Sequence, residues 1–183
     1  QNSQRINKEE KMNTISKHSI ASILLIALFS TGLATAGEHP TVDEQVAGLV
    51  KMCADSEAAR VARQEAKPLY YRLGEYDKIY DLTAEIVRLH SINPDFERFW
   101  GRIDEEKLVK NVSDFVSTGT GGPKVYTGRD IPSAHASLEL SKTDFLSAGG
   151  DVSQAMKNKG YGDEEIQEFV CILVSMKDLV ITR

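Results

Sequence analysis

The sequence contains little proline and cysteine, and it has no excess of positive charge. Among its 183 residues there are 5 prolines and 2 cysteines, and the net charge is -5 at pH 7. This balance disfavours nucleic-acid binding, which requires a basic surface that displaces counterions from phosphates. The acidic residues form no long run of the kind found in disordered tails. The length and the 41% hydrophobic content indicate one domain with a sizeable core and an appendage.

The N-terminal region has the composition of an export signal. Met12 is followed by a weakly basic opening and by an apolar stretch from Ile20 to Phe29, which is too short to span a bilayer comfortably. Ala34-Thr35-Ala36 then places small residues where signal peptidase requires them. We therefore expect a signal peptide at residues 12–36, cleavage before Gly37, and export to the periplasm. An uncleaved membrane anchor is the alternative.

Residues 37–67 are interpreted as a helical N-terminal extension that is packed on, or tethered to, the main domain. An amphipathic helix is predicted from the spacing of Val46, Leu49, Val50 and Cys53. A helix-compatible stretch of alanines and charges then runs to Pro68, a boundary because the residue before proline avoids helical backbone angles. We assign the main domain to residues 68–183, and we interpret residues 1–11 as upstream or fragment sequence.

The main domain is predicted to be all-α, because from residue 75 onward no segment alternates apolar and polar residues over the length of a strand. The helical period gives four apolar faces: Ile79, Leu82, Ile86, Leu89 and Ile92 or Asn93; Leu108, Val112, Phe115 and Val116; Phe145, Ala148, Val152, Ala155 and Met156; and Ile166, Phe169, Val170, Leu173 and Val174. Asp104 and Ser141 are predicted N-caps. Pro94, the glycines before Pro123, and Gly160 end the first three helices.

A glycine-rich hinge between the second and third helices carries a specific motif. Gly121-Gly122-Pro123 is followed by Tyr126-Thr127-Gly128-Arg129-Asp130 and then by Ala134-His135-Ala136. This arrangement resembles the segment that leads into the proximal histidine of group I truncated haemoglobins. The resemblance extends from Leu69 to the end of the chain, and it includes the corner from Asn93 to Trp100.

The resemblance implies a two-over-two helical sandwich that holds b-type haem, with His135 as the iron ligand. A neutral imidazole suits this task because its unperturbed pKa is about 6.5. The other residues that the resemblance places around the haem are Phe99, Trp100, Tyr126 and Arg129. The alternatives are a surface histidine at 135, core aromatics at the corner, and solvated charge at Arg129 and Lys124. Covalent c-type attachment is excluded because no Cys-x-x-Cys-His occurs.

The expected gas-binding side of the haem lacks the polar side chains that are common in the family. Val87 stands where a tyrosine is common, and Leu108 and Val112 occupy the two positions that overhang the ligand. One missing hydrogen bond to a partly charged oxygen ligand costs about 1.5 to 3 kcal/mol. We therefore expect fast oxygen release, with carbon monoxide and nitric oxide less affected. Asn111 or Tyr80 as a substitute donor is the alternative.

Three functions remain open from the sequence. The first is a gas-binding haem protein for oxygen, nitric oxide or carbon monoxide, including nitric oxide dioxygenation with an unidentified reductase. The second is an electron-transfer or peroxidase-like haem protein with a second axial ligand, for which His90 is weighed against a partly exposed histidine near a helix end. The third is a haem-free helical interaction module. A monomer or dimer, and the pairing of Cys53 with Cys171, also remain open.

Overall fold

The computed structural model describes residues 39–101 and 103–183, and these form helices and connecting loops. The expected upstream sequence, signal peptide and cleavage site before Gly37 lie outside the described residues. Residues 39–183 belong to one compact unit. In the described part, strand-like pairing is limited to one isolated bridge between Leu140 and Ile181. No helix in these residues is long and apolar enough to cross a membrane.

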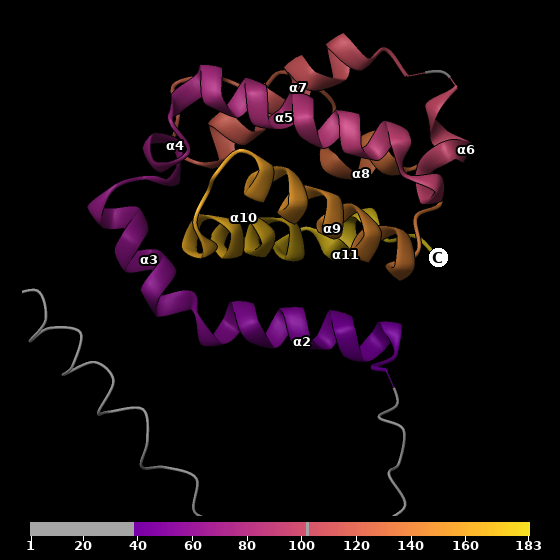
Figure 1. Cartoon of the computed structure of the whole chain (residues 1–183), viewed down its shortest axis with the longest axis horizontal. Coiled ribbons are helices and arrows are strands. Elements are labelled where there is room, and N and C mark those ends of the chain that lie inside the picture. The colour runs from indigo at the N-terminus through magenta and orange to yellow at the C-terminus, as the bar shows by residue number, and fades with distance from the viewer. Residues whose placement is uncertain (1–38, 102) are drawn as a thin grey trace, which may run out of the picture. The chain divides into compact units, whose positions relative to one another are not determined.

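Two pairs of long helices form two layers. Figure 1 shows α5 (Glu75–Ile92) beside α7 (Glu105–Gly119), and α9 (Lys142–Asn158) beside α10 (Asp163–Ser175). Contacts between α5 and α9 join the layers. The predicted all-α, two-over-two sandwich is confirmed. The short elements are α4 (Leu69–Arg72), η1 (Pro94–Phe96), α6 (Glu97–Trp100), α8 (Ile131–His135) and α11 (Lys177–Val180).

The main core lies between the layers and uses most of the predicted apolar faces. Its buried members are Leu69, Tyr70, Leu73, Ile79, Leu82, Ile86, Val116, Val152, Ala155, Met156 and Phe169. The prediction that Ile92 continues the buried face of α5 was wrong, because its side chain is 66% exposed. Ile92 is the last residue of α5, and at Asn93 the backbone becomes extended and leaves the core.

α7 buries a different face from the one that the hydrophobic pattern predicts. Its buried residues are Val109, Ser113, Val116 and Ser117. Leu108 and Phe115 are only half-buried, so the prediction was wrong at these two positions. Val116 is buried, and the half-buried Val112 packs against the main core. Small side chains suit a closely packed helix contact, and the Ser113 hydroxyl donates to the Val109 carbonyl at 2.7 Å, which satisfies it. Leu108 and Phe115, on the adjacent side of α7, are left half-buried and can contact another group.

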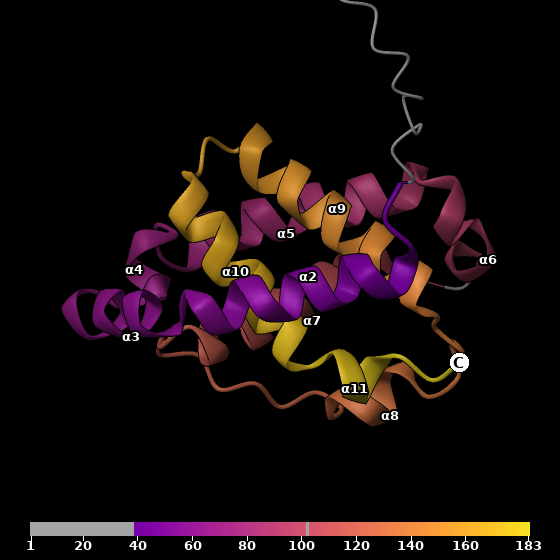
Figure 2. The ribbon, with the colours of Figure 1, turned by 90° about the horizontal axis from the view of Figure 1, so that it is seen from below.

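The N-terminal extension forms α2 (Val42–Asp55) and α3 (Glu57–Ala66). Figure 2 shows α2 running across the face of α10 and α9, and contacts with both helices agree with this view. Val46 and Cys53 are buried, whereas Val50 is 40% exposed. The assignment of Val50 to the apolar face was therefore wrong. A helix presents only a narrow stripe to its neighbours, and Val46, Leu49 and Cys53 already fill it.

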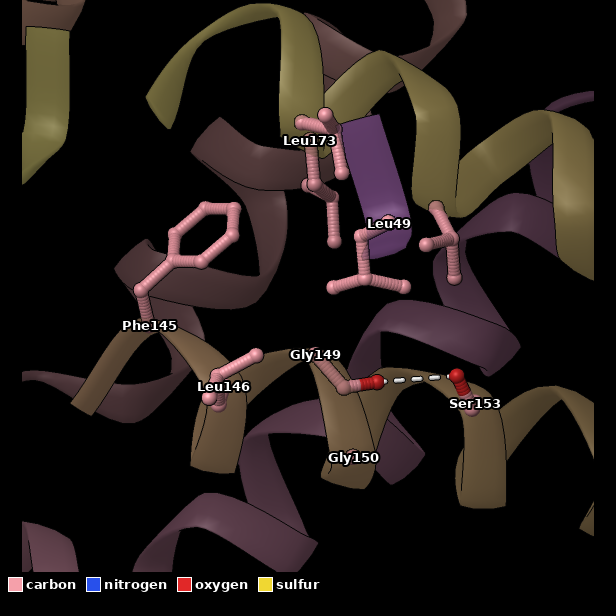
Figure 3. A pocket seen from close by; sticks show the side chains of 9 residues that line it. Leu49, Phe145, Leu146, Gly149, Gly150, Ser153 and Leu173 are labelled. Atoms are coloured by element: carbon pink, nitrogen blue, oxygen red, sulfur yellow. Dashed lines mark hydrogen bonds between the residues drawn. The ribbon is translucent and has the colours of Figure 1, made fainter. Parts of the chain in front are cut away.

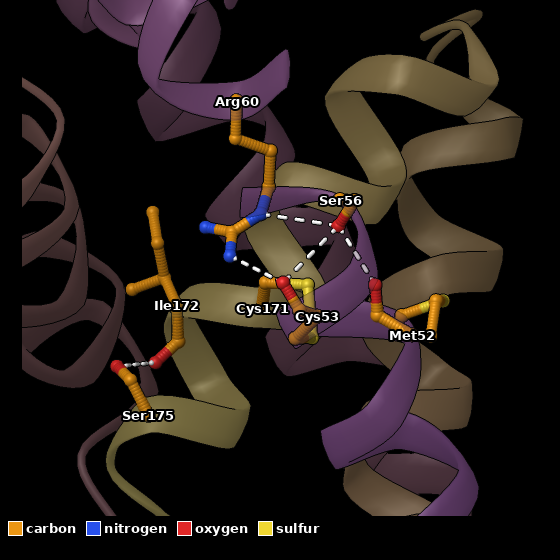
Figure 4. Close-up of a disulfide and its surroundings, with 7 residues drawn as sticks. All are labelled: Met52, Cys53, Ser56, Arg60, Cys171, Ile172 and Ser175. Atoms are coloured by element: carbon orange, nitrogen blue, oxygen red, sulfur yellow. Dashed lines mark hydrogen bonds between the residues drawn. A yellow bond between two sulfur atoms is a disulfide. The ribbon is translucent and has the colours of Figure 1, made fainter. Parts of the chain in front are cut away.

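A disulfide joins Cys53 of α2 to Cys171 of α10, with the two Cα atoms 5.4 Å apart (Figure 4). This answers the question of pairing that the sequence left open. Beside it, the Arg60 guanidinium of α3 donates to the Cys53 carbonyl at 2.7 Å, and the Ser56 hydroxyl donates to the Met52 carbonyl at 2.8 Å. The Met52 carbonyl also accepts from the Ser56 backbone N–H at 3.1 Å, so both side chains bind carbonyls in the last turn of α2, where carbonyls commonly lack helical partners.

A buried carboxylate ties α6 to the start of α9. The Arg98 guanidinium lies 2.7 Å from the Asp144 carboxylate, and the backbone N–H and hydroxyl of Ser141 donate to it at 2.8 Å and 2.7 Å. Burial by itself raises the pKa of Asp144, but the hydrogen bonds from Arg98 and Ser141 outweigh it and lower the pKa to about 2. The Asp144 side chain is only 7% exposed, whereas that of Arg98 is 44% exposed, so solvent screens this ion pair from the Arg98 side.

The Asp144 carboxylate is expected to make the folded state sensitive to acid. Since its folded pKa lies below the unfolded value of about 3.9, the stabilisation is present above pH 4 and is lost as the pH falls toward 2. Asp144→Asn should lower the free energy of unfolding at pH 7 by about 2 kcal/mol, measured by urea denaturation. Asp178→Asn is the control, because that side chain is 85% exposed. A deficit in Asp144→Asn that stays constant from pH 7 to pH 3 would contradict the role of this ionisation.

Candidate functional site

The residue at the centre of the predicted site lies on the short helix α8. Asp130 caps this helix by accepting a hydrogen bond from the Ser133 N–H at 2.7 Å, and Pro132 stands in its first turn. Proline fits there because the first N–H groups of a helix have no partner within it. α11 packs against α8 from the other end of the chain. The sequence between α7 and α9 therefore folds into a short, supported platform for His135.

The imidazole of His135 is fixed by one nitrogen, which leaves the other for a ligand. Its Nδ1 lies 2.8 Å from the carbonyl oxygen of Ile131, one turn earlier in α8. A carbonyl only accepts hydrogen bonds, so Nδ1 carries the proton, and Nε2 of the neutral ring has a free lone pair. Within residues 39–101 and 103–183, no group hydrogen-bonds to Nε2. The ring is half-buried. A hydrogen bond from one ring nitrogen to a backbone carbonyl commonly orients a histidine that binds a metal through the other nitrogen.

The two glycines of the hinge are required by close approach and by backbone conformation. Gly121 has φ 90°, in the left-handed region that favours glycine. A Cβ on Gly122 would lie 2.4 Å from ring carbon Cδ2 of Tyr70 and 2.4 Å from Oγ of Ser117. The Gly122 N–H donates to the Ser117 carbonyl at 2.7 Å. The two glycines thus allow the backbone that follows α7 to pass close to Tyr70 of α4.

Tyr126 stabilises the hinge itself. Its hydroxyl donates to the Arg129 carbonyl at 2.9 Å, and the ring lies so close to Gly128 that a Cβ there would be 2.3 Å from the hydroxyl oxygen. The ring also meets Phe115 of α7 edge-on, with centroids 5.3 Å apart. The Tyr-Thr-Gly motif is therefore explained by packing of the loop. The Tyr126 hydroxyl, of a residue that the resemblance places around the haem, is thus bonded within the hinge.

A row of half-buried side chains on α7 faces this loop. It consists of Leu108, Asn111, Val112 and Phe115, which share one side of the helix by their spacing. Phe115, at the C-terminal end of the row, contacts Tyr126 of the hinge, and Val112 packs against the main core. Val87 of α5 is 4% exposed. The apolar character predicted for Val87, Leu108 and Val112 is thus accompanied by one polar side chain in the row, that of Asn111.

The aromatic corner is arranged around a residue that the sequence analysis did not single out. Phe96 of η1 is buried, and its ring lies 6.3 Å from that of Phe99 and 4.9 Å from the His90 ring. Phe99 is half-buried beneath the Arg98 guanidinium at 4.2 Å. Trp100 donates from its indole nitrogen to Glu105 at 2.9 Å. The spacing of three between Phe96 and Phe99 was the signal that would have identified the buried ring.

The other candidate side chains are engaged elsewhere. Nδ1 of His90 is within hydrogen-bond distance of the Asp151 carboxylate of α9, at 2.8 Å, and Asn93 donates to the same carboxylate at 2.9 Å. Tyr80 is 36% exposed. Arg129 donates to the Ser133 carbonyl at 3.3 Å, and the Lys124 ammonium lies over the Tyr76 ring at 4.6 Å. His90 thus has the structural role that the sequence analysis weighed against ligation.

The Tyr76 hydroxyl connects α5 to α7 near this site. It donates to Asp114 at 2.7 Å. Burial, followed by the bond to the Asp114 carboxylate, raises the pKa of Tyr76 to about 12, so the phenol stays protonated and the bond persists at neutral pH. In the described part of the chain, no three His, Cys, Asp or Glu side chains gather as a metal site. A site for iron held in a macrocycle needs only one such side chain.

Comparison with solved structures identifies the fold. A truncated haemoglobin from Tetrahymena pyriformis in its Fe(III) form matches with a TM-score of 0.58 at 19% identity, over 63% of this chain and 100% of that one. The 2/2 haemoglobin of Synechococcus sp. PCC 7002, with covalently attached haem, has a TM-score of 0.59 at 20% identity, over 63% and 99%. The truncated haemoglobin THB11 of Chlamydomonas reinhardtii has a TM-score of 0.54 at 26% identity, over 63% and 96%.

Sequence comparison adds no further relative, because no protein-family model and no curated protein matches the chain. The structural matches nevertheless span the whole, or nearly the whole, of the truncated haemoglobins concerned. The chain from residue 39 onward therefore contains the two-over-two fold of the truncated haemoglobins.

Proposed function

We propose that the protein is a haem-binding globin of the group I truncated type, with b-type haem held through Nε2 of His135. The observation that carries this proposal is the hydrogen bond from Nδ1 of His135 to the Ile131 carbonyl. It fixes the tautomer and the orientation of the ring, and it leaves Nε2 as the free donor atom that iron requires. The structural similarity to truncated haemoglobins supports haem binding.

The apolar side chains of α7 suit a flat apolar cofactor. The row of Leu108, Val112 and Phe115 is half-buried although its side chains are apolar, and a macrocycle would cover such a surface. A bound haem would supply an iron that takes diatomic gases such as oxygen, nitric oxide and carbon monoxide. Val87, Leu108 and Val112 would exclude water from that side and offer no hydrogen bond. His135 would hold the iron on the other side.

Titration of the purified haem-free protein with haem tests this proposal. We expect one haem per chain, a sharp Soret band, and a ferrous five-coordinate spectrum, because Val87, Leu108 and Val112, proposed for the gas-binding side, carry no atom that binds iron. A six-coordinate low-spin ferrous spectrum would point to electron transfer instead. A protein that folds but takes up no haem would identify a haem-free helical module and overturn the proposal.

The apolar side of the site is proposed to make oxygen dissociate fast. Val112 is half-buried, so the change Val112→Gln can add a hydrogen-bond donor without overfilling the core. Such a bond is worth about 1.5 to 3 kcal/mol, so the oxygen dissociation rate in stopped-flow experiments should fall about ten- to a hundredfold. Carbon monoxide dissociation should change much less.

Val125→Gln is the matched control for this substitution, because Val125 is 77% exposed and lies in the hinge. It should leave both rates unchanged. If oxygen already dissociates slowly from the wild-type protein, another group, such as Asn111, donates a hydrogen bond to the ligand.

Export from the cytoplasm is part of the proposal. The disulfide between Cys53 and Cys171 supports it, because such bonds persist mainly in oxidising compartments. Cleavage before Gly37 can be measured by mass spectrometry of the protein recovered from the periplasm.

A further inference from the structure

A pocket of about 180 Å³ lies between the N-terminal helix α2 and the layer of α9 and α10 (Figure 3). Its lining comes from three elements: Leu49 of α2; Phe145, Leu146, Gly149, Gly150 and Ser153 of α9; and Val170, Leu173 and Val174 of α10. Several of these side chains also pack around the disulfide. The pocket therefore exists only where α2 covers the globin-like layers.

The chemistry of the lining excludes polar ligands. Ser153 is the one lining residue with a polar side chain, and its hydroxyl donates to the Gly149 carbonyl at 2.9 Å (Figure 3). That bond satisfies the hydroxyl, so no free donor or charge of the lining points into the space. A water molecule needs two to four polar partners to occupy a cavity, and it would find few here. An uncharged apolar molecule would lose nothing on entering.

Two glycines inside α9 keep the space open. Gly149 and Gly150 lie in the middle of a 17-residue helix, where glycine is less stable than alanine. Close packing does not explain them, because a Cβ on either residue would meet no atom within 4 Å. Neither has the positive φ that favours glycine. Their effect on the structure is to leave volume between α9 and Leu49 that larger side chains would fill.

We propose that this pocket is a binding site for a small uncharged apolar molecule, up to about the size of benzene. Apolar cavities of about 150 Å³ bind benzene or xenon in proteins. The present pocket has a similar volume and an apolar lining, and it is partly open to solvent. The disulfide holds Leu49 of α2 over the pocket, since Cys53 follows Leu49 by one helical turn. This site is separate from the one around His135 and does not depend on the proposed haem.

Benzene is a suitable probe for the full-length protein. Methyl NMR spectra recorded during a benzene titration should show saturable shifts for Leu49, Val170 and Leu173. Gly149→Leu should fill the space and weaken binding at least tenfold. Gly48→Leu is the matched control, because Gly48 lies inside α2 at a position where a Cβ also meets no atom within 4 Å. It makes the same change outside the pocket, and benzene affinity should be retained.

The outcomes are distinguishable from effects on folding. Circular dichroism of Gly149→Leu establishes whether the variant is folded, and Ser153→Leu provides a second way to fill the pocket if it is not. Saturable binding that is lost in the filled variants and kept in Gly48→Leu supports the proposal. Absence of saturable binding, shifts centred elsewhere, or equal affinity in a folded filled variant would overturn it. None of these readouts uses haem absorption.

Discussion

The variant His135→Ala is expected to lose stoichiometric haem binding while keeping its fold. Nε2 of His135 is the proposed iron ligand, and it belongs to a ring that α8 already orients through the Ile131 carbonyl. Changes to residues that merely orient a metal ligand cost about 10- to 100-fold in affinity, so loss of the ligand itself should cost more than about a hundredfold. The measurement is haem titration followed at the Soret band, together with thermal unfolding of the haem-free protein.

Two control variants separate ligation from general damage. His39→Ala changes an exposed histidine and should bind haem as the wild type does. His90→Gln removes an imidazole that pairs with Asp151, and the ferrous spectrum should stay five-coordinate. Added imidazole should restore part of the Soret band to His135→Ala, because it supplies the missing nitrogen in solution. Full haem affinity in His135→Ala would show that another residue holds the iron.

The local parts of the candidate site could be predicted from the sequence, because short-range geometry requires them. Gly121 adopts a positive φ and Gly122 lies close to Tyr70. Both positions therefore favour glycine for local reasons, and the two glycines indicate the hinge in the sequence. The capping of α9 by Ser141 and Asp144 is similarly local. Periodicity also located the four long helices, since each has one continuous apolar face.

The errors arose where side chains meet partners that are distant in sequence. Hydrophobicity placed Leu108 on the buried face of α7, but Leu108 is only half-buried, whereas serines 113 and 117 are buried. Apolar residues on a helix can face another helix or a cofactor, and the periodic pattern is the same in both cases. The link between Arg98 and Asp144 joins two elements whose proximity no local signal reveals. The disulfide was undetermined for the same reason, because 118 positions separate its cysteines.

Removal of the disulfide is expected to have the largest effect on stability. The bond closes a loop with a sequence separation of 118, and in the chain-entropy treatment such a closure stabilises the fold by about 5 kcal/mol. This is a large share of the roughly 5 to 15 kcal/mol that stabilises a typical domain. The double variant Cys53→Ala and Cys171→Ala should therefore have a Tm about 10 to 20 °C below that of the wild type. Alanine is chosen because both sites are buried, where serine hydroxyls would need partners.

Reduction of the wild-type protein provides an independent measure of the same bond. A thiol reductant should lower the Tm of the wild type toward that of the double variant and leave the double variant unchanged. α2 and α3 should be the first elements to lose protection in hydrogen exchange, because the disulfide joins α2 to α10. The two long-helix pairs retain the main core, so haem binding by the folded double variant should persist. Equal Tm values for the oxidised wild type and the double variant would show that packing of α2 alone, without the covalent bond, holds the extension in place.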